Sequence, residues 1–191
     1  IYYKSSRYML LLGGLLFLGV NINISYLLEF LPPEYSGGKS VVFIVSISAF
    51  LSMACGANTA MIFNSEHYKF GVFLLVFLAL SAFIFNMIFI PVYGIEGAAF
   101  ATALSAILYA FMRIIFIAMK YKLQPLNLKS FYTLFLVGIC FFLNLFLPET
   151  ESIILNILIH SVIITCIYLL AVYLLKIIPE FHKHIPFLGK K

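Results

Sequence analysis

The chain consists of long apolar runs separated by short polar segments. Six runs can be recognised, at about 8–31, 40–63, 70–90, 95–119, 130–147 and 152–176. A helix of roughly 20 apolar residues spans the hydrocarbon core of a bilayer, and each run approaches or exceeds this length. The runs lack the alternation of apolar and polar residues that the strands of membrane β-barrels show. The pattern therefore predicts an all-α, polytopic membrane bundle of six transmembrane helices.

Helix-breaking residues mark the junctions between these runs. They are Pro32, Pro33, Gly37 and Gly38, then Asn64–His67, Pro91 with Gly94, Pro125, Pro148 and Pro179. Proline ends helices because it lacks the backbone N–H donor. Glycine ends them because it loses more conformational entropy in a helix than any other residue. All predicted connections are short.

The composition agrees with a membrane protein. Of 191 residues, 64% are hydrophobic and 10% are charged, whereas soluble domains average roughly 45–50% and about 25%. Both a soluble domain and a disordered chain are therefore excluded. Because the chain begins at Ile1, we expect it to be part of a longer protein. Lys4 and Arg7 precede the first run as in a signal peptide, but that run is too long for one.

The charges predict the orientation. Eleven of the twelve Lys and Arg residues fall on one side of the predicted membrane, and Lys39 alone falls on the other, with five of the seven Glu residues. The basic side is expected to be cytoplasmic, so both ends of the chain lie inside a multi-pass protein of the inner (plasma) membrane. The net charge of +5 then reflects topology and attraction to anionic membrane lipids. Nucleic-acid binding is not expected, since no basic stripe is interleaved with aromatic residues.

Polar residues inside the predicted spans are the candidate site residues. Asn21, Asn58 and Asn86 either line a cavity and bind sugar hydroxyls or water, or form hydrogen bonds between helices. Arg113 lies about two turns from the cytoplasmic end of its span. It either extends to the membrane surface or faces an anionic lipid phosphate. His160 is either a proton relay or a packed neutral imidazole.

Two spans carry small residues every four positions, which lets helix backbones approach closely. The sets are Ser48, Ser52, Gly56 and Ala60 in the second span, and Gly97, Ala101 and Ser105 in the fourth. These spans are expected to be central packing helices.

No motif for enzymatic chemistry is recognised, and neither a metal nor a cofactor is expected. Cys55, Cys140 and Cys166 lie inside apolar runs without metal-binding spacing, and are expected to be reduced residues that face lipid or pack in the bundle. His182 and His184 alone do not assemble a metal site.

One stretch is more specific. Residues 86–105 read N-x4-P-x2-G-x2-G-A-A-x-A-T-x2-S. This resembles the helix–turn–helix signature of polysaccharide and O-antigen flippases, in the multidrug/oligosaccharidyl-lipid/polysaccharide exporter superfamily. Residues 31–37 resemble the family's turn before the next span, and Cys55–Asn58 resembles its small-residue segment. The similarity covers roughly residues 8–125, and the last two spans match only in length and hydrophobicity.

The resemblance implies a two-lobed transporter. Residues 1–125 would be helices of the second lobe, and 126–191 would add two C-terminal helices with a cytoplasmic tail. The partner would be a missing N-terminal lobe of the same protein. The lobes would rock by alternating access and carry a polyprenyl-pyrophosphate-linked oligosaccharide outward for polysaccharide or lipopolysaccharide O-antigen biosynthesis. In relatives the cations that meet the pyrophosphate lie mostly outside this sequence, which leaves Arg113.

Other functions stay open. A cation-coupled multidrug antiporter of the same superfamily would need carboxylates inside the membrane, but Glu96, the one Glu near a span start, lies at the outer edge. A membrane-embedded polysaccharide-synthesis enzyme would carry a large outer loop, whereas the longest outer connection predicted is 32–39. A non-transporting scaffold of a polysaccharide-synthesis complex also stays open, because the sequence alone does not exclude it.

Overall fold

The computed structural model describes residues 2–35, 37–55, 58–123, 128–175 and 177. These residues form helices and their connections, without a strand among them, so the all-α prediction is confirmed. The elements, in chain order, are α1 (Tyr2–Leu28), the 3₁₀ helix η1 (Pro33–Tyr35), α2 (Gly38–Met53), α3 (Asn58–Phe63), α4 (Tyr68–Tyr121), α5 (Leu128–Leu143), the 3₁₀ helix η2 (Asn144–Phe146) and α6 (Ile153–Leu174).

Four segments of the described chain are long and apolar enough to cross a membrane. They are Tyr3–Leu28, Tyr68–Tyr121, Lys129–Phe146 and Ile153–Leu174. The apolar helix α2 has only 16 residues, fewer than the roughly 20 that a perpendicular span requires. The chain therefore has the helices of a membrane protein.

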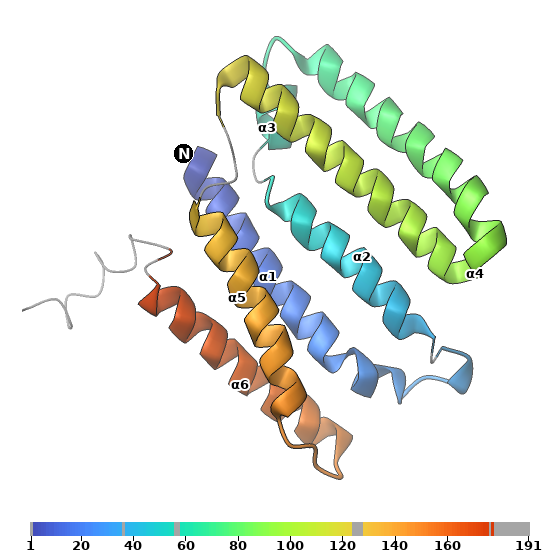
Figure 1. The fold of residues 1–191 in the computed structure, drawn as a ribbon, viewed down its shortest axis with the longest axis vertical. Helices are drawn as coiled ribbons and strands as arrows, with labels where there is room; N and C mark the ends of the chain where they lie inside the picture. The colour runs from blue at the N-terminus through green and yellow to red at the C-terminus, as the bar shows by residue number, and fades with distance from the viewer. Residues whose placement is uncertain (1, 36, 56–57, 124–127, 176, 178–191) are drawn as a thin grey trace, which may run out of the picture.

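Helix α4 is a hairpin of two arms. Gly94, with φ 57° and ψ −128°, is non-helical and separates residues 68–93 from 95–121. The arms lie side by side (Figure 1), and Phe70 of the first stacks on Phe116 of the second with ring centroids 4.1 Å apart. The predicted junction at Pro91 and Gly94 is thus made at Gly94, while Pro91 stays helical near the end of the first arm.

The predicted run 40–63 is not one helix, contrary to the expectation from its hydrophobicity. Helix α2 ends at Met53, and the N–H groups of Ala54 and Cys55 donate to carbonyls three residues earlier. Such bonds tighten the last turn of a helix and end it. Helix α3 then begins at Asn58.

The two predicted sets of small residues at every fourth position therefore differ in their burial. In the second span Ser48 is buried but Ala60 is exposed, and Gly56 lies outside the described residues. The set in the fourth span, Gly97, Ala101 and Ser105, is buried along the second arm of α4.

Helix α2 joins two packing groups. On one side, α1 contacts α2, α5 and α6, and a core that includes Leu10, Phe17 and Tyr168 fills their interface. On the other side, α2 lies along the α4 hairpin, whose arms pack with α3 around Leu74 and Ile117. Figure 1 shows α2 between α1 and the α4 hairpin.

Opposite charges gather at opposite ends of the bundle. The start of α1, the α3–α4 turn, the end of α4, the start of α5 and the end of α6 share one end (Figure 1). This basic end carries Lys4, Arg7, Lys69, Lys120, Lys122 and Lys129. The opposite, acidic end carries Glu29, Glu34, Glu96, Glu149 and Glu151, with Lys39. The predicted segregation of charge therefore holds among the described residues. Lys176, Lys183, Lys190 and Lys191, which the prediction placed on the basic side, lie outside them.

We expect Gly97→Ala to destabilise the protein, because a Cβ at this position would lie 2.2 Å from the carbonyl oxygen of Phe89. Forcing such a contact typically costs about 1–3 kcal/mol. The matched control is Gly138→Ala in α5, where a Cβ meets nothing within 4 Å and the helix should gain up to about 1 kcal/mol. Thermal unfolding in detergent measures both. Equal stability of the two variants would contradict the close approach at the hairpin turn.

Candidate functional site

Arg113 is buried inside the bundle. It lies on the second arm of α4, eight residues before the end of the helix, or roughly 12 Å along its axis. Only 8% of the residue is exposed. Its Nη1 donates a hydrogen bond to Oγ1 of Thr59 on α3, and its guanidinium carbon lies 4.3 Å from the centroid of the Tyr109 ring. The Thr59 hydroxyl holds this cation against α3, and the ring of Tyr109, one turn earlier on the same arm of α4, packs on the guanidinium.

The break between α2 and α3 lies on the same stretch of α4. Sγ of Cys55 donates to the carbonyl oxygen of Ala110 at 3.7 Å, and the N–H of Asn58 donates to the carbonyl oxygen of Cys55 at 3.1 Å. Asn58 is fully buried. The predicted residues Asn58 and Arg113 are therefore brought together, because Thr59, next to Asn58, binds the guanidinium. We call Cys55, Asn58, Thr59, Tyr109 and Arg113 the Arg113 site.

One N–H group of the Arg113 guanidinium has no hydrogen-bond acceptor in the described structure. Its Nε is buried without a hydrogen-bond partner among the described residues, and no carboxylate in that part of the chain forms an ion pair with it. A buried cation without a carboxylate attracts anions strongly, since little water screens its charge. Arginine suits phosphate in particular, because its planar donors match two oxygens at once.

Asn21 lies in a different place, at the interface of α1 and α2. Its Nδ2 donates to the carbonyl oxygen of Phe17 and to Oγ of Ser46, both at 2.8 Å. Its Oδ1 is buried without a partner among the described residues. The side chain lines a groove of about 380 Å³ that also includes Lys39. Asn21 thus ties two helices together and also presents an acceptor beside a cavity.

Asn86 joins neither group. It is half-buried on the first arm of α4, and its Nδ2 donates to the carbonyl oxygen of Ala82, one turn earlier, at 2.8 Å. A side chain that bonds to its own helix is satisfied locally. The structure therefore gives Asn86 no contact with the Arg113 site.

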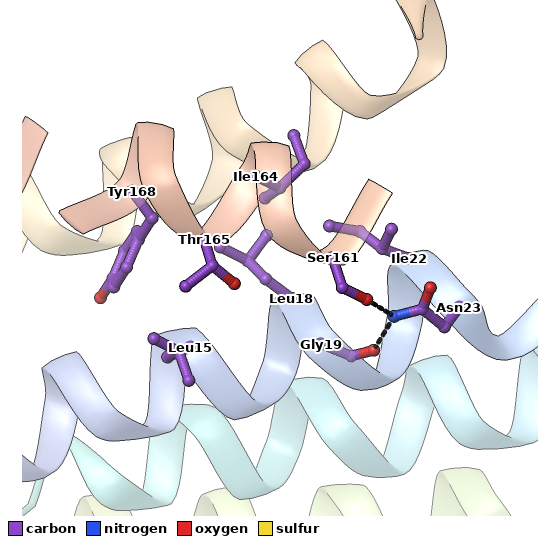
Figure 2. Close-up of a pocket in the computed structure, with 9 residues that line it drawn as sticks. All are labelled: Leu15, Leu18, Gly19, Ile22, Asn23, Ser161, Ile164, Thr165 and Tyr168. Atoms are coloured by element: carbon purple, nitrogen blue, oxygen red, sulfur yellow. Dashed lines mark hydrogen bonds between the residues drawn. The ribbon is translucent and has the colours of Figure 1, made fainter. Parts of the chain in front are cut away.

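A polar contact that the sequence did not single out lies between α1 and α6. Nδ2 of Asn23 donates to Oγ of Ser161 at 2.8 Å and to the carbonyl oxygen of Gly19 at 2.7 Å (Figure 2). The pocket beside them, which Thr165 also lines, has a volume of about 10 Å³. That volume suits one water molecule at most. The contact is structural, and nothing in the local sequence indicates that Ser161 is its partner.

No family model, curated protein or solved structure matches the chain.

A pair of variants separates a functional from a structural role for Arg113. We expect Arg113→Met to leave the free energy of unfolding within about 1 kcal/mol of the wild type or to raise it, because an apolar residue removes the cost of burying a charge. Thr59→Val should lower it by about 1–3 kcal/mol, since the guanidinium then loses its hydroxyl acceptor. Chemical unfolding in detergent measures both. A large loss in Arg113→Met alone would mean that Arg113 is kept for stability.

Proposed function

We propose that this chain is the second-lobe part of a membrane transporter that moves a lipid-linked oligosaccharide across the inner membrane by alternating access. The observation that carries the proposal is the Arg113 site, a buried cation with an unused donor beside a broken helix. Ionisable residues inside membrane segments mark substrate paths, and interrupted helices commonly form transporter sites. The site suits a phosphate or pyrophosphate, the anionic part of such a lipid.

The substrate class is supported by the residues that resemble the flippase signature. Two of its glycines are used for backbone geometry. Gly94 has the positive φ that favours glycine, and Gly97 allows the second arm of α4 to approach the carbonyl oxygen of Phe89. The signature therefore coincides with a hairpin whose shape depends on those residue types.

The proposed topology has six passes. The two arms of α4 make two of them, α2 and α3 together make one, and α1, α5 and α6 make the others. Successive connections then alternate between the basic and acidic ends (Figure 1). With the basic end in the cytoplasm, both ends of the chain lie inside. Residues 1–125 would belong to the second lobe, and 126–191 would be the additional C-terminal part.

The position of the carboxylates favours this function over a cation-coupled antiporter. In the described part of the chain, the glutamates lie near the ends of the helices or in the connections between them. Coupling to a cation through carboxylates would require them at membrane depth. The charged group at depth is instead the cation of Arg113.

Cysteine labelling tests the proposed topology. In a variant of the full-length protein without Cys55, Cys140 and Cys166, single cysteines at Gly38 and Glu149 should react with an impermeant maleimide added outside intact cells. Cysteines at Glu66 and Lys122 should react only after the membrane is opened, because the basic end faces the cytoplasm. The reverse pattern would refute the orientation.

Transport assays test the role of Arg113. In proteoliposomes containing the full-length protein, Arg113→Met should slow transfer of a polyprenyl-pyrophosphate-linked oligosaccharide roughly tenfold to a hundredfold. That range corresponds to losing a charge-assisted hydrogen bond worth about 1.5–3 kcal/mol. Arg113→Lys should retain part of the rate, since it keeps the charge without the planar donors.

Asn86→Ala is the control for this assay, because Asn86 bonds only within its own helix in the described structure. It should transport at close to the wild-type rate. A wild-type rate in Arg113→Met would remove the Arg113 site from the proposed function.

A further inference from the structure

His160 lies buried where three elements meet near the acidic end. It is on α6, and 2% of it is exposed. Its Nδ1 is 2.8 Å from Oδ1 of Asn144 in η2. Its ring packs edge-on against Tyr26 of α1, with centroids 5.6 Å apart. Histidine is the side chain whose charge ordinarily changes between pH 5 and 8.

The contact with Asn144 fixes the tautomer of the neutral imidazole. Because Oδ1 of Asn144 can only accept, Nδ1 carries the proton and donates it. Nε2 then carries a lone pair that can accept a hydrogen bond. It is buried without a partner among the described residues. Binding a second proton at Nε2 would create a charged donor that lacks an acceptor in this arrangement.

The groups around the imidazole can supply that acceptor. On α1, the Tyr26 hydroxyl donates to Oε1 of Glu149 at 3.4 Å, and Glu29 is close enough to interact electrostatically with Tyr26. Glu149 lies in the connection between α5 and α6. The residue of η2 that contacts His160, Asn144, does not titrate. In the described structure, Tyr26 therefore packs against His160 and links it to two carboxylates, Glu149 and Glu29.

The same contacts hold the α5–α6 connection in place. Besides Asn144–His160 and Glu149–Tyr26, the backbone N–H of Thr150 donates to Oδ1 of Asn156, and Nδ2 of Asn156 donates to the carbonyl oxygen of Thr150, both at 2.8 Å. Residues 144–152 are thus attached to α1 and α6 through three hydrogen-bonded residue pairs. Two of these pairs include an ionisable side chain.

We propose that His160 is a proton-binding site and that protonation of Nε2 loosens the attachment of residues 144–152. The proton comes from the solution at the acidic end, and no covalent bond other than the new N–H bond forms. The buried imidazolium is stabilised when Oε1 of Glu149 leaves the Tyr26 hydroxyl and turns towards Nε2, and this movement breaks the Tyr26–Glu149 bond. Mildly acidic solution at that end therefore shifts the connection to a second arrangement.

Hydrogen exchange of the full-length protein in lipid nanodiscs tests the proposal. The quantity to compare is the exchange rate of residues 144–156 in the wild type divided by the rate in His160→Gln at the same pH, because intrinsic exchange cancels in this ratio. Glutamine keeps a donor for Asn144 but does not titrate. The ratio should rise at least threefold between pH 7.5 and pH 5.5. A ratio independent of pH would overturn the proposal.

Two further variants sharpen the test. Asn144→Asp places a carboxylate on Nδ1, which favours the imidazolium, so the midpoint of the transition should move up by about one pH unit or more. His67→Gln, at the opposite end, is the matched control and should leave the wild-type transition unchanged. A transition that persists in His160→Gln, or that His67→Gln abolishes, would assign the effect to another group.

The signal of the His160 ring in nuclear magnetic resonance spectra gives a second readout in the wild type, independent of whether any variant folds. It should titrate over the pH range in which exchange rises, and an imidazole that stays neutral down to pH 5 would overturn the proposal. Because both readouts are structural, their outcome is separate from the transport assay for the proposed function.

Discussion

A polar atom buried among apolar helices loses its water and must find a partner within the protein. Hydrogen bonds that satisfy this constraint connect the helices of the bundle. Asn21 and Ser46 join α1 to α2, Asn23 and Ser161 join α1 to α6, and Asn156 joins the α5–α6 connection to α6. Each bond adds little by itself, about 0.6 kcal/mol on average in membranes. Their main effect is to fix which helices are neighbours, since an unpaired partner would cost more.

The exceptions to this constraint are therefore informative. In the described structure, Ser6, Asn23 and His67 each have one buried atom without a partner, and so do Arg113 at Nε, Asn21 at Oδ1 and His160 at Nε2. Each of the last three lies beside a feature that a purely structural bundle does not need. These are, in the same order, a broken helix, a groove and a connection attached by ionisable groups. The unused donor of Arg113 suits an anion, and the unused lone pair of His160 suits a proton.

Much of the fold was predictable because its causes are local in the sequence. Hydrophobic runs predict helices, and the segregation of Lys and Glu predicts which ends lie together. Gly94 follows Pro91 at the spacing of a turn, and Gly97, Ala101 and Ser105 share a helix face, as their burial confirms. The break after Met53 was not predictable, because the apolar run 40–63 continues through it without a proline or a charge.

The partners of the polar residues depend on which helices pack together. Asn21 and Asn86 look alike in the sequence, yet one bonds across to α2 and the other only to its own helix. His160 lacked an acidic neighbour in any span, and the structure supplies Glu149 from a connection through Tyr26.

The single non-helical residue in α4 constrains how the chain enters the bilayer. With only Gly94 outside helical geometry, the two arms are too closely joined for one to remain in water while the other is in lipid. Leaving one arm behind would also expose apolar side chains such as Phe83 and Met87 to water. Residues 68–121 are therefore expected to insert together during synthesis, as one paired unit whose backbone polar groups are already satisfied.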